Sequence, residues 1–459
     1  MSLKTVYQNI LKLKETASTN SKTLLLTEML KNDDFKRVTE LTYSDEKHFN
    51  IQTLPKRKVS SSYSLWDTSN KKTGNQEIFN FLEKLSEQRG TSQEDKENLV
   101  KLSSCDEETY NVVKMVVNKD FKCGIGQKTI NKSMPGLIYI MPYCRCSTEK
   151  KIDNINFENG AFAQEKADGM FVNVIISPEK TITFKTRNGN KVHQLQKLNS
   201  ILHKKVTSGI NIDYANTVYM GELLVRVNGK ILDRQTGNGI LNSCIQNTAN
   251  QAMADCVIVK LWDAVPYHHW NEHKSSLNYS DRWNRVNKFV DYLYHDEVTT
   301  ISTNKVNSLR EAKDFYKKMR KEGKEGAIIK NRSMKWKFHD SPDAVKLKNV
   351  SDAELRIVGW KYGKEGTKIE NVMGTLQVAT DDGLVQVNIS GFTDKQRELN
   401  WDEMIGKIVT VEFESLIQDK SRPGIYSLYL PRFADDELQI RMDRSQTDTL
   451  EDIQNRTKV

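Results

Sequence analysis

Residues 164–177 read Gln-Glu-Lys-Ala-Asp-Gly-Met-Phe-Val-Asn-Val-Ile-Ile-Ser, a polar segment that runs directly into an apolar, strand-like run. Before this segment the chain is patterned for helices, and after it mostly for strands. Lys166 stands next to Glu165 and ahead of the turn-forming Gly169. The arrangement suits an ordinary hairpin, and it also suits a lysine nucleophile, which needs burial or neighbouring cations to lower its pKa. The second reading requires cations and phosphate ligands elsewhere in the chain.

Outward from this segment, the hydrophobic pattern divides the chain into three parts. Residues 1–148 carry apolar side chains at helical spacing, most clearly at 78–87 and 108–117. Residues 149–349 combine strand-like runs beginning at 171, 181 and 256 with amphipathic helices around 281–294 and 306–321. Residues 350–459 contain five short strand-like runs with glycine turns, which predict a small β-barrel, most commonly an OB-fold when nucleic acid is the ligand. The predicted fold class is multidomain α+β.

The chain has 459 residues and a formal charge of +9, which is unevenly distributed. Residues 1–150 hold 24 basic and 19 acidic side chains, residues 151–350 hold 31 and 21, and residues 351–459 hold 14 and 20. The three net charges are therefore +5, +10 and −6. A basic body favours a polyanionic partner, although a solubilising surface explains the charge equally well.

The sequence also excludes several other classes of protein. No apolar run approaches the ~18 residues that span a bilayer, and lysines interrupt the N-terminus where a secretory signal has an apolar core. Six cysteines in so long a chain predict neither a disulfide framework nor a zinc ribbon, since Cys144 and Cys146 are an isolated pair. We expect an intracellular protein with no membrane partner.

Candidate phosphate ligands and cations follow the lysine in a particular order. They lie in turns or at strand ends: Arg187 in Thr-Arg-Asn-Gly, Glu222 in Gly-Glu-Leu, Trp262 in Leu-Trp-Asp, Glu325 and Lys330 in Glu-Gly-Ala-Ile-Ile-Lys, Lys346 and Lys348 in Lys-Leu-Lys, and Arg441, Asp443 and Arg444 in Arg-Met-Asp-Arg. Taken singly, Trp262 is explained as a residue of the hydrophobic core and Glu222 as a surface carboxylate. An arginine at a turn can nevertheless hold a phosphate, and a tryptophan face can stack on a base. The ordered set points to chemistry on a nucleotide.

This set resembles the motif series of the covalent nucleotidyltransferases, and specifically that of the ATP-dependent DNA ligases of T-even-type bacteriophages. The resemblance extends from about Phe35 to about Arg444. Further matches are FKRVTELTYS at 35–44, FKCGIGQKTINKSMPGLI at 121–138, GNGI at 237–240 and LWDAVP at 261–266. The resemblance implies an all-helical DNA-binding domain at 1–148, an α+β nucleotidyltransferase (adenylation) domain at 149–349 and an OB-fold domain at 350–459.

The implied activity is the sealing of nicks in double-stranded DNA with ATP and Mg²⁺. Lys166 would attack the α-phosphate of ATP, forming a lysyl-AMP intermediate and releasing pyrophosphate. AMP would pass to the 5′-phosphate of the nick, and the 3′-hydroxyl would then displace AMP and close the strand. Because all three steps move charge at phosphorus, positioning and electrostatic stabilisation should dominate catalysis.

The resemblance also implies a role for each motif residue of the central domain. Asp168 would help organise the 3′-hydroxyl, and Arg187 would bind the nick 5′-phosphate and also contribute to binding of the nucleotide. Lys346 and Lys348 would hold the α-phosphate and lower the pKa of Lys166 by like-charge repulsion. The remaining roles are adenine contacts for Gln164 and Trp262, a ribose contact for Glu222, nucleotide binding for Lys330, and Mg²⁺ binding for Glu222 and Glu325.

Two further sets of residues lie outside the central domain. Arg441, Asp443 and Arg444 would orient the pyrophosphate leaving group, which requires the barrel to close over ATP by a hinge near Val350. In the helical domain, a hairpin would contact DNA phosphates through its backbone and side chains, at Gly124, Gly126, Lys128 and Lys132. The hairpin superficially resembles a P-loop, but no glycine stands directly before its Lys-Thr pair.

Two positions depart from the pattern of the family. Phe171 stands where an arginine is usual, two residues beyond Gly169, so a sugar or phosphate contact is lost or supplied elsewhere. Arg444 replaces the usual lysine of the last motif, which keeps the charge but changes its geometry.

Alternative functions remain at this point. RNA ligation and RNA capping use the same lysine chemistry, although the helical segment before Lys166 argues against capping. A basic DNA clamp without catalysis is a further alternative, weakened by the presence of every predicted nucleophile and phosphate ligand. An NAD⁺-dependent ligase is disfavoured because the four-cysteine zinc module of that branch is missing. We expect a monomer that encircles nicked duplex DNA in the cytoplasm of a host cell.

Overall fold

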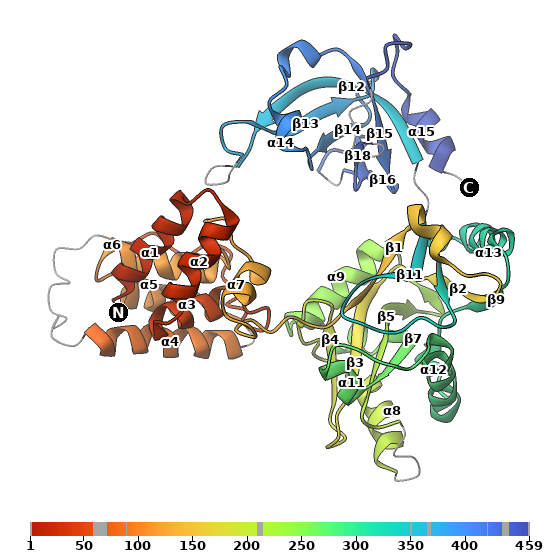
Figure 1. Ribbon diagram of the computed structural model, residues 1–459, viewed down its shortest axis with the longest axis horizontal. Helices are drawn as coiled ribbons and strands as arrows, with labels where there is room; N and C mark the ends of the chain where they lie inside the picture. Colours follow the sequence, from red (N-terminus) through yellow and green to blue (C-terminus); the bar gives the residue numbers. More distant parts are fainter. Residues whose placement is uncertain are drawn as a thin grey trace. The chain divides into compact units, whose positions relative to one another are not determined.

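The computed structural model describes residues 2–57, 71–88, 90–208, 214–348, 351–364, 369–419, 421–433 and 440–457 (Figure 1). The chain separates into two compact units, Met1–Tyr316 with Ala327–Lys346, and Lys317–Gly326 with Leu347–Val459. The hinge predicted near Val350 lies outside the described residues. No helix in the described ranges is both long enough and apolar enough to cross a bilayer.

The N-terminal part is helical, as the spacing predicts. Its helices are α1 (Leu3–Glu15), α2 (Thr19–Met29), α3 (Asp33–Tyr43), α4 (Lys71–Glu87), α5 (Gln93–Ser103), α6 (Glu107–Val117) and the short α7 (Gln127–Ser133). Side-chain oxygens cap the first turns of α1, α2, α3, α5 and α6 by accepting backbone N–H groups that the helix leaves unpaired. The predicted helical segments at 78–87 and 108–117 fall within α4 and α6 and are confirmed.

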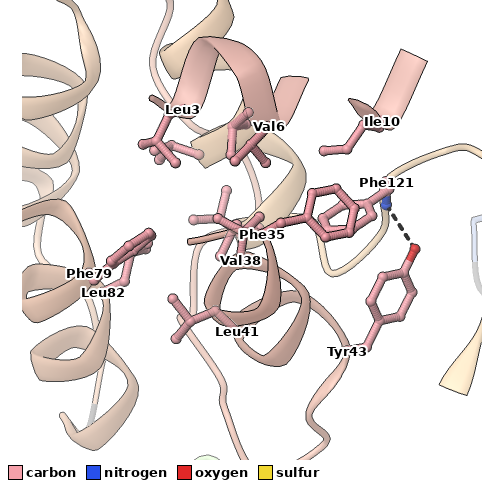
Figure 2. Close-up of a cluster of buried hydrophobic side chains, with 14 of the residues drawn as sticks. Leu3, Val6, Ile10, Phe35, Val38, Leu41, Tyr43, Phe79, Leu82 and Phe121 are labelled. Atoms are coloured by element: carbon pink, nitrogen blue, oxygen red, sulfur yellow. Dashed lines mark hydrogen bonds between the residues drawn. The ribbon is translucent and has the colours of Figure 1, made fainter. Parts of the chain in front are cut away.

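One apolar core holds these helices together (Figure 2). Helix α1 contributes Leu3, Val6, Ile10 and Leu13 at the three- and four-residue spacing that lines one helix face. Phe121 packs edge-on against the ring of Tyr43, with ring centroids 5.1 Å apart, and its backbone N–H donates to the Tyr43 hydroxyl at 3.2 Å. This contact fixes the segment that leads into α7.

The central part contains two β-sheets. The first has the strand order β1-β11-β10-β2-β9, formed by β1 (Cys144–Thr148), β2 (Ala161–Lys166), β9 (Thr303–Val306), β10 (Gly326–Asn331) and β11 (His339–Lys348). The second has the order β4-β3-β5-β7-β8, formed by β3 (Met170–Ile176), β4 (Ile182–Thr186), β5 (Thr217–Val227), β7 (Val257–Pro266) and β8 (Val298–Thr300), and β6 (Lys230–Ile231) pairs with β5. Residues 167–169 join the two sheets, because β2 ends at Lys166 and β3 begins at Met170.

Helices and short helical turns connect these strands. They are η2 (Glu149–Asn154), α8 (Gln196–Thr207), α9 (Arg234–Ile245), α10 (Gln251–Ala254), α11 (Tyr267–Asn271), α12 (Tyr279–Leu293) and α13 (Leu309–Lys321). The amphipathic helix α12 buries Val286, Phe289 and Leu293 in a core that it shares with β3, β5 and β7. The strands predicted at 171, 181 and 256 and the two predicted helices are confirmed.

The C-terminal part is built on an antiparallel sheet of the order β14-β13-β12-β15-β18, with a separate β16-β17 hairpin. Its elements are β12 (Ser351–Tyr362), β13 (Met373–Ala379), β14 (Gln386–Ile389), α14 (Asp394–Arg397), η3 (Asp402–Met404), β15 (Ile408–Phe413), β16 (Ser415–Gln418), β17 (Tyr426–Tyr429), β18 (Arg432–Phe433) and α15 (Leu450–Thr457). All five predicted strand runs lie on strands. The pattern missed β16 and β18, which are short and only partly buried.

Candidate active site

Lys166 is the last residue of β2, a strand whose other five residues are buried. The side chain of Lys166 is half-buried at the point where the chain leaves the first sheet. Strand β2 lies between β10 and β9, and the Glu165 N–H donates to the Ser302 carbonyl at 2.8 Å. Both sides of the strand are therefore fixed, and the lysine projects from a rigid element, as a positioned nucleophile requires.

Gly169 and Glu222 meet in the turn that follows the lysine. The Gly169 N–H donates to Glu222 Oε1 at 3.1 Å. A Cβ atom at position 169 would lie 2.2 Å from the Leu223 carbonyl oxygen and 2.7 Å from Leu224 Cδ2. Only glycine fits so close to β5, and this close approach holds the Glu222 carboxylate beside the lysine-bearing turn.

Asp168, in the same turn, is exposed and forms an ion pair with Arg234. The distance from Arg234 Nη1 to Asp168 Oδ1 is 2.9 Å, and each side chain keeps 42% of its surface exposed. Arg234 is the first residue of α9. The sequence pattern did not single out Arg234, because nothing local marks an arginine that pairs with a carboxylate 66 positions earlier.

Phe171, at the position where the family usually has arginine, lies in a row of aromatic rings. Its ring centroid is 5.8 Å from that of Trp262 and 4.8 Å from that of Tyr143. The guanidinium of Arg187 lies over the Tyr143 ring, 4.4 Å from its centroid. The structure thus connects the predicted adenine-stacking residue and the predicted 5′-phosphate ligand through two rings.

Gln164 is fully buried, and its amide is bound to other side chains. The amide nitrogen donates to Thr303 Oγ1 at 3.1 Å, and Tyr279 Oη lies 2.6 Å from Gln164 Oε1. Lys330 Nζ donates to the same Tyr279 hydroxyl at 3.1 Å. The predicted contact between the Gln164 side chain and adenine would compete with these bonds, and it stays a prediction.

Lys330 is buried beneath this network. Its ammonium lies 4.4 Å from the centroid of the Tyr279 ring, and desolvation lowers its pKa despite the nearby Asp263 carboxylate. Asp263 is in turn held by the fully buried Arg282, at 2.7 Å and 3.2 Å. Neither Tyr279 nor Arg282 was predicted from the sequence, because each looks like an ordinary residue of an amphipathic helix.

The lysines of three motifs lie on the strands β2, β10 and β11 of the first sheet and act on one thiol of β1. Burial raises the pKa of Cys146, while the ammonium groups of Lys330, Lys346 and Lys166 act on it in the opposite direction. Lys346 is a residue of β11 and pairs in register with Thr148 of β1. Lys348 is the last residue of the same strand. The structure therefore brings Lys346 and Lys330 to the neighbourhood of the candidate nucleophile.

A Mg²⁺ ion would find two carboxylates among the predicted ligands. Glu222 lies beside the lysine-bearing turn, and Glu325 directly precedes β10, a neighbour of β2 in the first sheet. In the described ranges, no group of three or more His, Cys, Asp and Glu side chains is arranged to hold a metal. Each carboxylate taken singly is a donor of the kind that Mg²⁺ accepts, because this ion commonly binds one or two protein carboxylates together with substrate phosphates. Its binding by Glu222 or Glu325 stays a prediction.

The predicted pyrophosphate ligands of the C-terminal part are engaged in ion pairs. Arg441 forms a bidentate pair with Asp443, at 2.9 Å and 2.7 Å, and also pairs with the buried Glu354. Hydrogen bonds from Arg441 lower the pKa of Asp443 to about 2. Arg444 pairs with Asp448 at 3.2 Å. A pyrophosphate contact would have to share or replace these partners, and the predicted role stays a prediction.

The predicted DNA-contacting residues of the helical part lie together at its surface. Gly124 has a left-handed backbone (φ +70°), and Gly126 caps the N-terminus of α7. Lys128 and Lys132 are exposed and stand four residues apart on α7. Lys22 adds a further ammonium, which donates to the Cys123 carbonyl. The cluster has the composition of a phosphate-contacting surface.

Comparison with known proteins follows the same division of the chain. Residues 143–348 match the family described as "ATP dependent DNA ligase domain". The DNA ligases of Enterobacteria phages T6 and T4 are each 28% identical to this chain over 481 aligned positions, which cover 95% of this chain and 95% of each relative. The solved structure "Pmar-Lig_PreS3" has the same fold, with a TM-score of 0.72 at 19% identity, and the match covers 94% of this chain and 98% of that one. Residues 143–348 thus match the ATP-dependent DNA ligase domain, and the similarity to the DNA ligases of the T-even phages T6 and T4 extends over nearly the whole chain.

Proposed function

We propose that this ligase seals 5′-phosphate/3′-hydroxyl nicks in duplex DNA through a lysyl-AMP intermediate and an adenylylated DNA intermediate. The observation that carries the proposal is the setting of Lys166. It stands at the end of a buried strand, with Lys330 and Lys346 on the strands β10 and β11 of the same sheet and Glu222 held beside its turn. Clustered cations attract phosphate and stabilise the negative charge that moves onto its oxygens during transfer.

In the first step, the Lys166 amine attacks the α-phosphorus of ATP, loses its proton and displaces pyrophosphate. Trp262 offers its face to adenine, Glu222 lies near the ribose, and Lys346 and Lys348 neutralise the α-phosphate. Mg²⁺, when bound by Glu222 or Glu325, would neutralise charge on the phosphate oxygens. Arg441, Asp443 and Arg444 orient the pyrophosphate once the C-terminal domain has closed over ATP.

In the second and third steps, AMP passes from Lys166 to the 5′-phosphate of the nick, and the 3′-hydroxyl then displaces AMP. Arg187 binds the 5′-phosphate, and Asp168 helps to organise the 3′-hydroxyl. The positions of both residues support these roles. Arg187 is connected to Trp262 through the rings of Tyr143 and Phe171, and Asp168 lies in the turn that directly follows Lys166. The second step breaks the bond between phosphorus and the Lys166 nitrogen, and the third breaks the bond between the 5′-phosphate and AMP. Neither step needs a further co-reactant.

The proposed domains are a helical DNA-binding domain at 1–148, an adenylation domain at 149–349 and an OB-fold at 350–459. The first of these boundaries is moved from 148 to 143, because strand β1 (Cys144–Thr148) pairs with β11 and therefore belongs with the adenylation domain. A parallel bridge between Val385 and Tyr426 connects the β16-β17 hairpin to the main C-terminal sheet, which supports barrel closure. We further propose that a single chain encircles the DNA, in the cytoplasm of a host cell.

Labelling of the protein by ATP tests the lysine chemistry. Protein that has first been stripped with pyrophosphate is mixed with Mg²⁺ and ATP labelled on the α-phosphate, and the denatured chain is examined for label. We expect wild-type protein to become labelled and Lys166→Ala to remain unlabelled. Label that persists in Lys166→Ala, or wild-type protein that stays unlabelled, would contradict the mechanism. A Lys313→Ala variant, changed at an exposed lysine of α13, serves as the matched control.

Sealing of nicked substrates then separates DNA ligation from RNA ligation. Matched duplexes with a nick in a DNA strand or in an RNA strand are given to the adenylylated protein. We expect the DNA nick to be closed faster. Preferential closure of the RNA nick would instead favour the RNA ligase alternative, and adenylylation without closure of either nick would point to another acceptor.

A further inference from the structure

Arg187 occupies an exposed turn whose backbone is well defined. The turn is closed by the Gly189 N–H, which donates to the Thr186 carbonyl at 3.0 Å, and Gly189 has the left-handed backbone (φ +89°) that favours glycine. In the described part of the chain, the Arg187 guanidinium forms no ion pair. The side chain is long and has many rotamers, so its backbone alone does not fix the position of the guanidinium.

The ring of Tyr143 supplies a fixed surface for the Arg187 guanidinium. Its half-buried ring lies under the Arg187 guanidinium, 4.4 Å from the ring centroid, which is the geometry of a cation–π contact. Tyr143 directly precedes β1, whereas Arg187 directly follows β4, so the contact joins the edges of the two central sheets. The planar guanidinium can stack on the ring and still direct its N–H groups outward to a phosphate.

Phe171 holds the Tyr143 ring in this orientation. The two rings meet at an interplanar angle of 83°, with centroids 4.8 Å apart, so that an edge contact fixes Tyr143 without covering its face. Phe171 itself contacts Trp262, and both pack against a buried cluster that includes Met141, Ile175 and Val218. An arginine at position 171 would offer no such ring edge and would place a second cation near Arg187.

We propose that Tyr143 is a positioning residue that pre-orients Arg187 for the nick 5′-phosphate, and that Phe171 replaces the usual arginine of the family as its aromatic support. This inference rests on the proposed role of Arg187 in nick sealing. Its physical basis is preorganisation: a guanidinium that is already stacked loses less rotamer freedom when a phosphate binds. The contact therefore acts on the DNA substrate and not on ATP.

A double-mutant cycle tests the proposal. Adenylylated wild-type protein, Tyr143→Leu, Arg187→Ala and the double variant are compared in the sealing of nicked DNA, with rates counted per adenylylated chain. For Tyr143→Leu we expect a roughly two- to fivefold rise in KM for the nick, the range set by an exposed cation–π contact. Tyr143→Phe, which keeps the ring, should restore the wild-type KM. In the Arg187→Ala background, Tyr143→Leu should have little further effect, because its partner is absent.

Tyr292→Leu is the matched control, because Lys205 lies over the Tyr292 ring at 5.3 Å in a similar cation–π contact between α8 and α12. Its KM should stay at the wild-type value. If Tyr143→Leu does not fold, Tyr143→Met replaces it, since methionine keeps bulk but has no ring face. An unchanged KM for Tyr143→Leu, or an equal rise with and without Arg187, would overturn the inference. Wild-type protein that neither adenylylates nor seals would instead overturn the proposed function.

Discussion

Arg234, the first residue of α9, forms an ion pair with Asp168 in the turn after the nucleophile, at 2.9 Å between Nη1 and Oδ1. Both side chains are 42% exposed, and exposed pairs of this kind contribute only about 0–1 kcal/mol to folding stability. The pair does, however, fix the direction of the carboxylate that we propose to organise the 3′-hydroxyl. Arg234 is therefore expected to matter for sealing more than for folding.

Replacing Arg234 with alanine tests this expectation. We predict that Arg234→Ala slows the sealing of nicked DNA by the adenylylated protein roughly tenfold or more, since small errors in the position of a reacting group are costly. The melting temperature should change little, and Arg234→Lys should recover part of the rate. Arg422→Ala, which removes an exposed pair with Asp419 in the C-terminal part, is the control. Equal sealing rates in Arg234→Ala and wild type would refute the prediction.

Gly169 should not tolerate any side chain. A Cβ atom there would lie 2.2 Å from the Leu223 carbonyl oxygen, so Gly169→Ala must push β5 away and disturb the Glu222 contact. We predict a loss of about 1–3 kcal/mol in the free energy of unfolding, as for other overpacked sites, measured by chemical denaturation. Gly239→Ala, at an exposed position of α9 with open space around it, should be neutral or stabilising. Equal stability of the two variants would contradict this account.

Lys128 and Lys132 provide a test of the DNA-binding surface. If both ammonium groups contact phosphates, binding of nicked DNA should weaken steeply between ~50 and ~200 mM salt through counterion release. Lys128→Ala and Lys132→Ala should each lower the slope of log K against log salt by about one. Fluorescence anisotropy of labelled nicked DNA measures both effects. An exposed lysine of α13, changed in Lys318→Ala, is the control, and an unchanged slope in both α7 variants would exclude this surface.

Acid should weaken the C-terminal part through Asp381. A bidentate pair with Arg356, at 2.7 Å and 2.9 Å, together with hydrogen bonds from Thr447, lowers the pKa of Asp381 from 3.8 to about 2. Because the folded pKa lies below the unfolded one, this stabilisation is fully present above about pH 4 and is lost as the pH falls towards 2.

We therefore predict that Asp381→Asn lowers the melting temperature at neutral pH and that the difference from wild type shrinks below about pH 4. Scanning calorimetry of the full chain between pH 2 and pH 7 measures this difference. Asp291→Asn, at an exposed carboxylate of α12, is the matched control. A difference between Asp381→Asn and wild type that stays constant down to pH 2 would show that the carboxylate contributes by another route.

The sequence by itself determined the local elements and the order of the motifs. Alternation and helical spacing depend only on neighbouring residues, so the strands that carry Phe171 and Trp262 and the helices α4, α6 and α12 could be predicted. From the sequence, Gly169 was predicted only to form a turn, and the reason why no other residue fits there was not. That reason, the carbonyl of Leu223 on β5, became visible only in the tertiary structure.

Tertiary structure alone decided which distant side chains meet. Asp168 with Arg234, Arg187 with Tyr143, and Gln164 with Tyr279 are separated by between 44 and 115 positions, and their approach depends on strand pairing and on how α9 and α12 pack. No local sequence pattern indicates which residues of distant segments come to lie opposite one another. The sequence therefore identified the groups that could perform the chemistry, and the fold selected the partners that orient them, because orientation comes from contacts between segments far apart in the chain.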